Sequence, residues 1–381
     1  MIQRSIANKL QHFATKYPIV TVTGPRQSGK TTLIKASFPD YEYVNFEDPD
    51  VLQMAKEDPR LFLNRYQGKA IFDEVQRIPE LFSYLQNHVD SHNKEGMYIL
   101  SGSQNFLLME KLSQSLAGRT AILKLLPFSK SEIAAPSLKF NLPDELIFTG
   151  GYPRLFDKNI APTEFYPFYI QTYIERDVRQ LQNITNIDSF IRFVKLCAGR
   201  IGQLLNLSSI ANECGITQPT AKAWLSVLQV SYIVFLLQPY HKNFNKRLVK
   251  TPKLYFYDTG LACSLLGMKN HEQLITHYLR GGLFENWVIA ELIKTYFNKA
   301  ETPSIYFWRD NIGNEIDLLV ENGRHVETYE IKSGATYNVK FFRGLKYWSK
   351  ITEAENKGTV VYGGDKTMET PHGKLIGWKD F

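Results

Sequence analysis

One loop of the sequence has, at each fixed position, a residue type that can help to hold a phosphate. It runs from Gly24 to Thr31, with four residues between its two glycines and a Lys-Thr pair directly after the second. Glycine allows backbone angles that other residues avoid, so successive amide N–H groups can turn inward around a phosphate at a helix N-terminus. Lys30 would reach the terminal phosphates, and the Thr31 hydroxyl would complete a magnesium shell. The pattern predicts a nucleoside triphosphate site made of Gly24, Pro25, Arg26, Gln27, Ser28, Gly29, Lys30, Thr31 and Thr32.

Such a loop works only between a buried strand and a helix, and the flanking residues predict both. The apolar run 19–23 precedes the loop, and the helix-compatible segment 32–36 follows it. A helix with apolar residues at helical spacing is expected between residues 6 and 17, before the first strand. The alternating run 41–46 predicts the next strand, and the acidic turn at 48–50 predicts the start of another helix.

A second strand end carries the residues that hydrolysis would need. The apolar run 70–72 is followed by Asp73 and Glu74. At the carboxyl end of the strand, Asp73 would hold Mg²⁺, mostly through water, and Glu74 would orient or deprotonate the attacking water. Acidic residues often begin surface loops, but together with an upstream phosphate loop they predict a chain that hydrolyses the nucleotide as well as binding it.

A third predicted strand, 97–100, leads into the polar turn 101–105. A hydroxyl at this turn could sense the γ-phosphate between the phosphate loop and the two acidic residues. We assign that role to Ser103 first and to Ser101 second, with a plain turn as the alternative.

Two arginines could bind phosphate charge. Arg119 lies at a predicted helix-to-strand junction, where it could act on its own chain or on a neighbour, or could simply be solvated. Arg176 is the second candidate, and a structural role beside Asp177 is its alternative.

These stretches resemble the AAA-like ATPases of bacteria and archaea in which a large C-terminal domain of uncharacterised function follows the nucleotide domain. The resemblance implies a parallel-sheet P-loop fold. With the residues above, it makes ATP and Mg²⁺ the expected cofactors and Lys30 and Glu74 the expected catalytic residues. The matching stretches are 24–31, 72–74, 100–103, 116–119, 150–153 and 173–177, with the C-terminal elements described below.

The middle of the chain has the pattern of a winged helix. Residues 207–216 and 217–228 have helix-turn-helix spacing, and 230–237 and 253–257 are predicted strands. The loop between these strands would be a basic wing suited to phosphate contact, which makes DNA a predicted partner. Winged helices also serve as packing modules, and the second helix offers few base-reading side chains. The wing residues are Lys242, Lys246, Arg247, Lys250 and Lys253, and the base-reading candidates are Gln218, Thr220 and Lys222.

The C-terminal region places two carboxylates and a lysine on neighbouring predicted strands. Asp317 lies in the run 315–320, and Glu330 and Lys332 lie on one face of the run 325–332, because strand side chains alternate. Such a group can hold magnesium, activate water and stabilise a pentavalent phosphate. Glu285, on a preceding amphipathic helix, completes the expected acidic set of Glu285, Asp317 and Glu330 as metal ligands.

This arrangement resembles the restriction-endonuclease-like fold, with Glu285, Asp317 and Glu330-Ile331-Lys332 at matching places. The resemblance implies phosphodiester cleavage with Asp317, Glu330 and Lys332 as catalytic residues. Similar residues can also serve for binding alone, so three alternatives remain: an ATP-coupled nuclease, an ATP-gated switch that cuts no DNA, and a regulator directed at protein.

Length and composition limit these alternatives. The length of 381 residues suggests two or three domains. The motifs and resemblances above predict an α/β protein of three: a P-loop AAA-like ATPase (1–150), a helical connector with a winged helix (151–275), and a restriction-endonuclease-like domain (276–381). The net charge of +7 permits nucleic-acid contact without requiring it. The chain could also assemble with copies of itself.

Cysteine usage and hydropathy bear on the compartment. Cys197, Cys214 and Cys263 are odd in number and have apolar neighbours, which favours buried free thiols over disulfides or a zinc cluster. No run reaches the roughly 18 apolar residues that a membrane span needs. We therefore expect a cytoplasmic protein without membrane contact.

Overall fold

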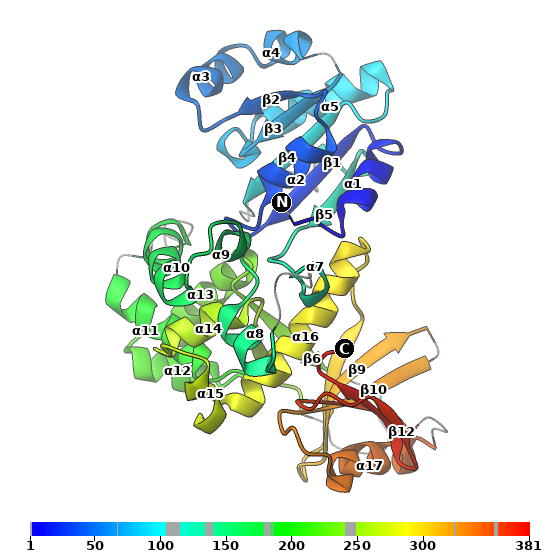
Figure 1. Ribbon diagram of the computed structural model, residues 1–381. Helices are drawn as coiled ribbons and strands as arrows, with labels where there is room; N and C mark the ends of the chain where they lie inside the picture. The colour runs from blue at the N-terminus through cyan, green and yellow to red at the C-terminus, as the bar shows by residue number, and fades with distance from the viewer. Residues whose placement is uncertain are drawn as a thin grey trace.

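The computed structural model describes residues 2–66, 68–103, 115–133, 140–178, 184, 186–240, 249–323, 325–353 and 357–381, with the backbone alone at 103 and over 175–178. Figure 1 shows an N-terminal sheet with its helices, a group of helices beside it, and a C-terminal sheet that packs beside a long helix. This confirms the predicted α/β class.

The N-terminal sheet is parallel and has the strand order β2-β3-β4-β1-β5. All six residues of β1 are buried, as expected for a strand with helices on both faces. In a parallel sheet all carboxyl ends lie along one edge, which brings the phosphate loop after β1 next to the acidic end of β3. The strands are β1 (Ile19–Gly24), β2 (Glu42–Asn45), β3 (Ala70–Asp73), β4 (Tyr98–Ser103) and β5 (Thr120–Lys124).

Side-chain caps start two helices of this region. Asp48 and Asp58 each accept a hydrogen bond from a backbone N–H of the following first turn, and each precedes a proline that suits that turn. The helices are α1 (Ala7–Ala14), α2 (Lys30–Ser37), α3 (Pro49–Glu57), α4 (Pro59–Arg65), α5 (Leu81–His92) and the 3₁₀ turn η1 (Val75–Arg77).

The middle region is mostly helical. Gly215, in the left-handed conformation, ends α12, and the Thr217 side chain caps α13, which gives the predicted helix-turn-helix. The predicted strand 230–237 starts later than expected, because α13 continues to Val230 and β6 begins at Val234. The helices are α7 (Lys130–Ile133), α8 (Pro143–Thr149), α9 (Pro153–Asp157), α10 (Pro162–Tyr169), the π-helix η2 (Ile170–Val178), α11 (Ile187–Ala198), α12 (Leu207–Cys214), α13 (Gln218–Val230), α14 (Thr259–Leu265) and α15 (Glu272–Thr276).

The C-terminal sheet is mixed and has the strand order β12-β13-β11-β10-β9-β8-β6-β7. The hairpin β6–β7, predicted as the wing, joins this sheet because β6 pairs in parallel with β8 at Pro239 and Phe307. The elements are β6 (Val234–Pro239), β7 (Lys253–Phe256), α16 (Arg280–Asn298), β8 (Ile305–Arg309), β9 (Glu315–Asn322), β10 (His325–Lys332), η3 (Val339–Phe342), α17 (Arg343–Thr352), β11 (Thr359–Tyr362), β12 (Met368–Thr370) and β13 (Gly373–Gly377).

The largest hydrophobic core among the described residues joins the middle and C-terminal regions. Its residues pack together in one cluster and come from positions between Leu126 and Trp378. The C-terminal sheet and this core both contain residues from before and after the predicted boundary at residue 275. The domain boundaries themselves stay predictions. The three cysteines are buried and free, and burial raises the pKa of each thiol. Within the described residues, no helix combines the length and apolar composition that crossing a membrane requires.

Candidate functional site

The phosphate loop has the backbone that its sequence predicts. Gln27, with a φ of 61°, and Gly29, with a φ of 90°, are both left-handed, which turns successive amide groups to one side. Gly24 cannot carry a side chain, because a Cβ there would lie 2.1 Å from the Leu125 carbonyl oxygen. The loop ends at Gly29, directly before the first residue of α2, where the helix N-terminus favours an anion.

Lys30 is buried in this loop with neutral partners. Its ammonium donates to the carbonyl oxygens of Gly24 at 3.0 Å and Pro25 at 2.8 Å. Burial lowers the pKa of Lys30 to about 8, although Glu74 and Asp73 act in the opposite direction. Because no carboxylate of the described residues forms an ion pair with it, this ammonium would be stabilised most by a phosphate.

Asp73 is the centre of the polar contacts at the edge of the sheet. One carboxylate oxygen accepts hydrogen bonds from the hydroxyls of Thr31 at 2.7 Å and Tyr43 at 2.8 Å, and the other accepts one from Ser101. The side chain is 4% exposed, so these donors take the place of water. Asp73 is therefore fixed beside the threonine with which it is expected to share Mg²⁺.

Tyr43 is a site residue that the sequence analysis missed. Its position in the sequence could have indicated this role. Tyr43 lies two residues before Asn45, so both side chains share a face of β2, and Asn45 pairs with Asp73 on the neighbouring β3. Alternation predicts which residues share a face, but only the strand order reveals that this face meets Asp73.

Glu74 follows Asp73 in a left-handed conformation with a φ of 56°, which is unusual for a residue with a side chain. The Gln76 amide donates a hydrogen bond to its carboxylate. Backbone strain at such a position is common at functional sites. The arrangement suits a carboxylate that orients a water molecule.

The loop fits ATP and Mg²⁺. The Ser28 hydroxyl is buried and has no hydrogen-bond partner among the described residues, which is costly unless a ligand supplies one. Thr31 and Asp73 would hold Mg²⁺, which supplies positive charge to the β- and γ-phosphates when bound. Lys30 and the loop amides would hold the phosphates, and Glu74 would take the proton of the water. Arg26 and Thr32 flank these groups, and their ligand contacts stay predictions.

The first choice for the γ-phosphate sensor finds less support than the second. Ser101 contacts Asp73, whereas the Ser103 side chain lies outside the described residues. The backbone of Ser103 pairs with Gly24 at the end of β4. The structure therefore shows Ser101 at the site, and the sensor role of Ser103 stays a prediction.

Arg119 is not placed to act on its own nucleotide site, which corrects one of its predicted roles. Arg119 directly precedes Thr120, and Thr120 pairs with Ile19, the first residue of β1. The phosphate loop follows the last residue of β1, at the opposite end of the strand. The six residues of β1 separate the two ends by roughly 20 Å at about 3.3 Å per residue. Arg119 instead forms two hydrogen bonds, of 2.6 and 2.7 Å, to Asp90.

The other predicted cations lie at undescribed, exposed or buried positions. The side chain of Arg176 and the wing residues 242–248 lie outside the described residues, and Lys250 is exposed. Lys253 is 3% exposed, so its predicted phosphate contact on an exposed wing is wrong. It faces the C-terminal carboxylates because β7 is a strand of the C-terminal sheet.

Those carboxylates form a compact cluster on β9 and β10. Asp317 accepts hydrogen bonds from the Ile331 amide at 2.7 Å and the Lys332 ammonium at 2.9 Å, and Lys332 also pairs with Glu330. Burial and the charge of Asp317 raise the pKa of Glu330 to about 9 despite Lys332. Burial acts to lower the pKa of Lys332, but the two carboxylates outweigh it and raise that pKa. The sequence analysis correctly predicted that these three side chains lie together.

Glu285 is hydrogen-bonded to two residues of β7. Its carboxylate accepts from Lys253 at 2.9 Å and from the Tyr255 hydroxyl, and Lys253 also pairs with Glu315. Among the described residues, no three or more His, Cys, Asp or Glu side chains are grouped so as to hold a metal ion. The metal site of Glu285, Asp317 and Glu330 therefore stays a prediction, and in the structure Glu285 is bound by Lys253 and Tyr255 instead.

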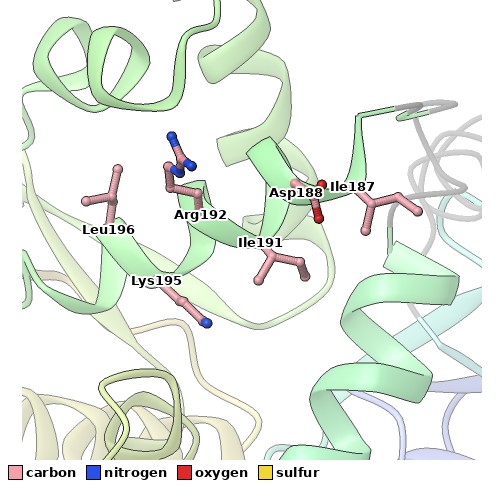
Figure 2. Close-up of a pocket in the computed structure, with 6 residues that line it drawn as sticks. All are labelled: Ile187, Asp188, Ile191, Arg192, Lys195 and Leu196. Atoms are coloured by element: carbon pink, nitrogen blue, oxygen red, sulfur yellow. The ribbon is translucent and has the colours of Figure 1, made fainter.

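A hollow of about 640 Å³ lies elsewhere, along α11. Figure 2 shows Arg192 and Lys195 extending from this helix, near the apolar Ile187, Ile191 and Leu196. Neither charged site contributes to its lining. Its cations are a surface feature beside the helix-turn-helix, since α11 packs against α12.

Comparison with known proteins gives the chain's family. The chain is 31% identical over 342 residues to Uncharacterized protein Rv2008c of Mycobacterium tuberculosis, and equally to Uncharacterized protein Mb2031c of Mycobacterium bovis. The alignment covers 88% of this chain and 75% of each relative. The chain belongs to the family of these mycobacterial proteins. Residues 16–134 match the AAA domain, and residues 141–272 and 280–381 match two domains of unknown function, DUF8612 and DUF4143.

Solved structures show weaker likenesses. The Walker-type ATPase PABY2304 of Pyrococcus abyssi is 15% identical with a TM-score of 0.49, over 70% of this chain and 96% of that one. AMPPCP-bound DnaA from Aquifex aeolicus is 16% identical with a TM-score of 0.31, over 59% and 85%. The assignment rests on the AAA match and the phosphate-loop geometry. This family member has an AAA-type P-loop ATPase domain, the kind of domain that binds and hydrolyses ATP.

Proposed function

We propose that the chain is an ATP-gated switch that acts on DNA, in which hydrolysis at Lys30, Thr31, Asp73 and Glu74 controls a C-terminal site that binds rather than cuts. The observation that carries this proposal is the charge balance of the C-terminal cluster. Lys253 and Lys332 both pair there with carboxylates, and Glu285 is held by Lys253. Each carboxylate of this cluster already has a lysine partner, so none of them requires a metal ion as its counter-charge.

DNA as the partner is supported by exposed polar groups near the helix-turn-helix. Gln218 and Lys222 are exposed at the start of α13, the position from which such helices read base edges. Arg192 and Lys195 line the hollow on α11, and the net charge of +7 favours a polyanion. The few base-reading side chains predict binding without strong sequence preference.

The test is the salt dependence of DNA binding in the presence of ADP and of a non-hydrolysable ATP analogue. The switch predicts a DNA affinity that falls steeply with salt and that differs between the two nucleotides. Arg192→Ala with Lys195→Ala should reduce the salt dependence, and Lys9→Ala, a change at an exposed lysine on α1, should not. Equal affinity with both nucleotides would remove the gating proposal.

Cleavage of DNA is the second candidate, because Asp317, Glu330 and Lys332 converge on one place. Its test is cleavage of plasmid and single-stranded DNA in Mg²⁺ or Mn²⁺, with and without ATP. Lys332→Ala should abolish any cleavage, whereas Lys340→Ala, at an exposed C-terminal lysine, should preserve it. Metal-dependent cleavage that is lost in Lys332→Ala would replace the binding switch by a nuclease.

A further inference from the structure

The strand β7 contacts the carboxylate cluster, and the residues that follow it lead toward the phosphate loop. Side chains of Lys253, Tyr255 and Tyr257 share a face of β7 and its extension, because strand residues alternate. Lys253 and Tyr255 both donate to Glu285 in the carboxylate cluster. Phe235 packs against this face, with its ring 5.5 Å from that of Tyr255 and 4.9 Å from that of Tyr257.

The other end of this face leads to the phosphate loop. The ring of Tyr257 lies 5.7 Å from the ring of Tyr232, and the Tyr232 hydroxyl lies 3.1 Å from the Thr23 hydroxyl. Thr23 directly precedes Gly24, the first residue of the loop. Tyr232 is left-handed, with a φ of 55°, so the packing around it holds it in a strained conformation.

A second route to the loop begins at Asp258, the residue after Tyr257. Its carboxylate accepts from the Gly151 amide at 2.8 Å and the Tyr166 hydroxyl at 2.7 Å. These bonds fix the segment that leads to Pro153, whose Cγ lies 3.6 Å from the position that a Cβ on Gly29 would occupy. Two series of neighbouring residues, which start at Tyr257 and Asp258 directly after β7, therefore lead to the two ends of the phosphate loop.

We propose that Lys253 is a positioning residue of the carboxylate site and that β7 transmits the nucleotide state of the phosphate loop to it. This inference rests on the proposed ATP-gated function and names the element that performs the gating. When the loop closes on a triphosphate, the contacts at Thr23 and Gly29 shift, and the strand moves with them. Lys253 then changes its distance to Glu285 and Glu315, and the field at Asp317 changes.

The surroundings of Lys253 make such a movement effective. Burial acts to lower the pKa of Lys253, but Glu285, Tyr255 and Glu315 outweigh it and raise that pKa well above the usual value. Charge interactions between buried groups are stronger than in water. A small displacement of the Lys253 ammonium therefore changes its interaction energy with Glu285 and Glu315 substantially. Close packing passes the displacement on rather than absorbing it.

The test is amide hydrogen exchange of the full chain, with and without a non-hydrolysable ATP analogue and Mg²⁺. The Ile331 amide is a direct reporter, because it donates to Asp317. The analogue should slow exchange in the phosphate loop and change exchange in β7 and at Ile331 by about fivefold or more, the lower end of typical coupling between sites. Tyr232→Phe should remove most of the distant change. Tyr41→Phe, which loses a comparable bond to the Gly96 carbonyl within the ATPase region, should retain it.

Lys253 is tested by two replacements. Lys253→Arg keeps the charge and should keep the response at Ile331, whereas Lys253→Met should lose it and still show protection of the phosphate loop. Should Lys253→Met fail to fold, Tyr255→Phe, which removes only one donor to Glu285, should weaken the response.

Each contrary result has a distinct meaning. Protection of the phosphate loop without any change in β7 or at Ile331 overturns the inference and leaves the ATPase domain intact. A response that survives in Tyr232→Phe and Lys253→Met overturns the roles of those residues. Absence of protection in the loop itself overturns both the proposed function and this inference.

Discussion

Two lysines sit beside acidic residues in this molecule, and their surroundings differ. Lys30 is buried and donates to two neutral carbonyl oxygens, and burial lowers its pKa to about 8. Lys332 pairs directly with Asp317 and Glu330, which raise its pKa in spite of burial. In the part of the chain that the structure describes, no carboxylate forms an ion pair with the Lys30 ammonium, whereas the Lys332 ammonium pairs with two.

The difference indicates what each site can bind. A buried cation with neutral partners is stabilised most by an incoming anion, so the phosphate loop is built for a triphosphate. A cation that lies between carboxylates, such as Lys332, is stabilised less by an incoming anion, because that anion must compete with the existing ion pairs. The C-terminal cluster therefore supports binding and regulation more than the capture of free phosphate.

The largest expected effect on ATP hydrolysis comes from removing the Lys30 ammonium, whose hydrogen-bond partners are neutral carbonyl oxygens. Lys30→Ala should lower ATP hydrolysis about 100-fold or more, comparable to the loss of a key charge-stabilising donor. Lys332→Ala should leave ATP hydrolysis close to the native rate. Phosphate release by both variants, with Lys9→Ala as a surface control, measures the contrast. A large loss of ATP hydrolysis in Lys332→Ala would contradict the separation of the two sites.

A smaller effect is expected at the residues that orient Asp73. Ser101→Ala removes one donor to this carboxylate and should lower magnesium-dependent hydrolysis about tenfold, as is usual for groups that hold a metal ligand. Ser103→Ala should have the weaker effect. The comparison is made from the hydrolysis rate over a magnesium titration. The reverse order would restore Ser103 as the sensor.

The pKa of Lys30 predicts how nucleotide affinity depends on pH. Below pH 8 the ammonium is charged before the nucleotide binds. Above it, binding must take up a proton, because a phosphate raises the pKa of Lys30. Affinity should therefore fall with rising pH, by at most about tenfold per pH unit. Equilibrium binding of a fluorescent ATP analogue on both sides of pH 8 measures this, and Lys30→Met should lose the dependence.

The smallest effect is expected at Arg119. Its guanidinium pairs with Asp90 at the surface, at the edge of the sheet away from the phosphate loop. Arg119→Ala should hydrolyse ATP at the native rate in dilute solution, where chains act singly. A loss that appears only as the protein concentration rises would show that Arg119 serves the site of a neighbouring chain.

The sequence by itself determined the nucleotide site and the parallel sheet. The spacing of Gly24, Gly29 and Lys30 specifies a local backbone, and the apolar run that ends at Asp73 specifies a buried strand. Asp317, Glu330 and Lys332 were also found, because alternation along β10 and a short hairpin to β9 bring them together. These features depend on residues close in sequence or on periodicity.

Tertiary structure alone decided which charges meet. Lys253 looks in the sequence like any lysine of a basic loop, yet the pairing of β6 with β8 turns it toward Glu285. Arg119 was placed by the direction of β5, and Tyr43 was brought to Asp73 by the strand order. Strand order and pairing are set by packing between distant segments, and a lysine's electrostatic role follows from its neighbours rather than from its type.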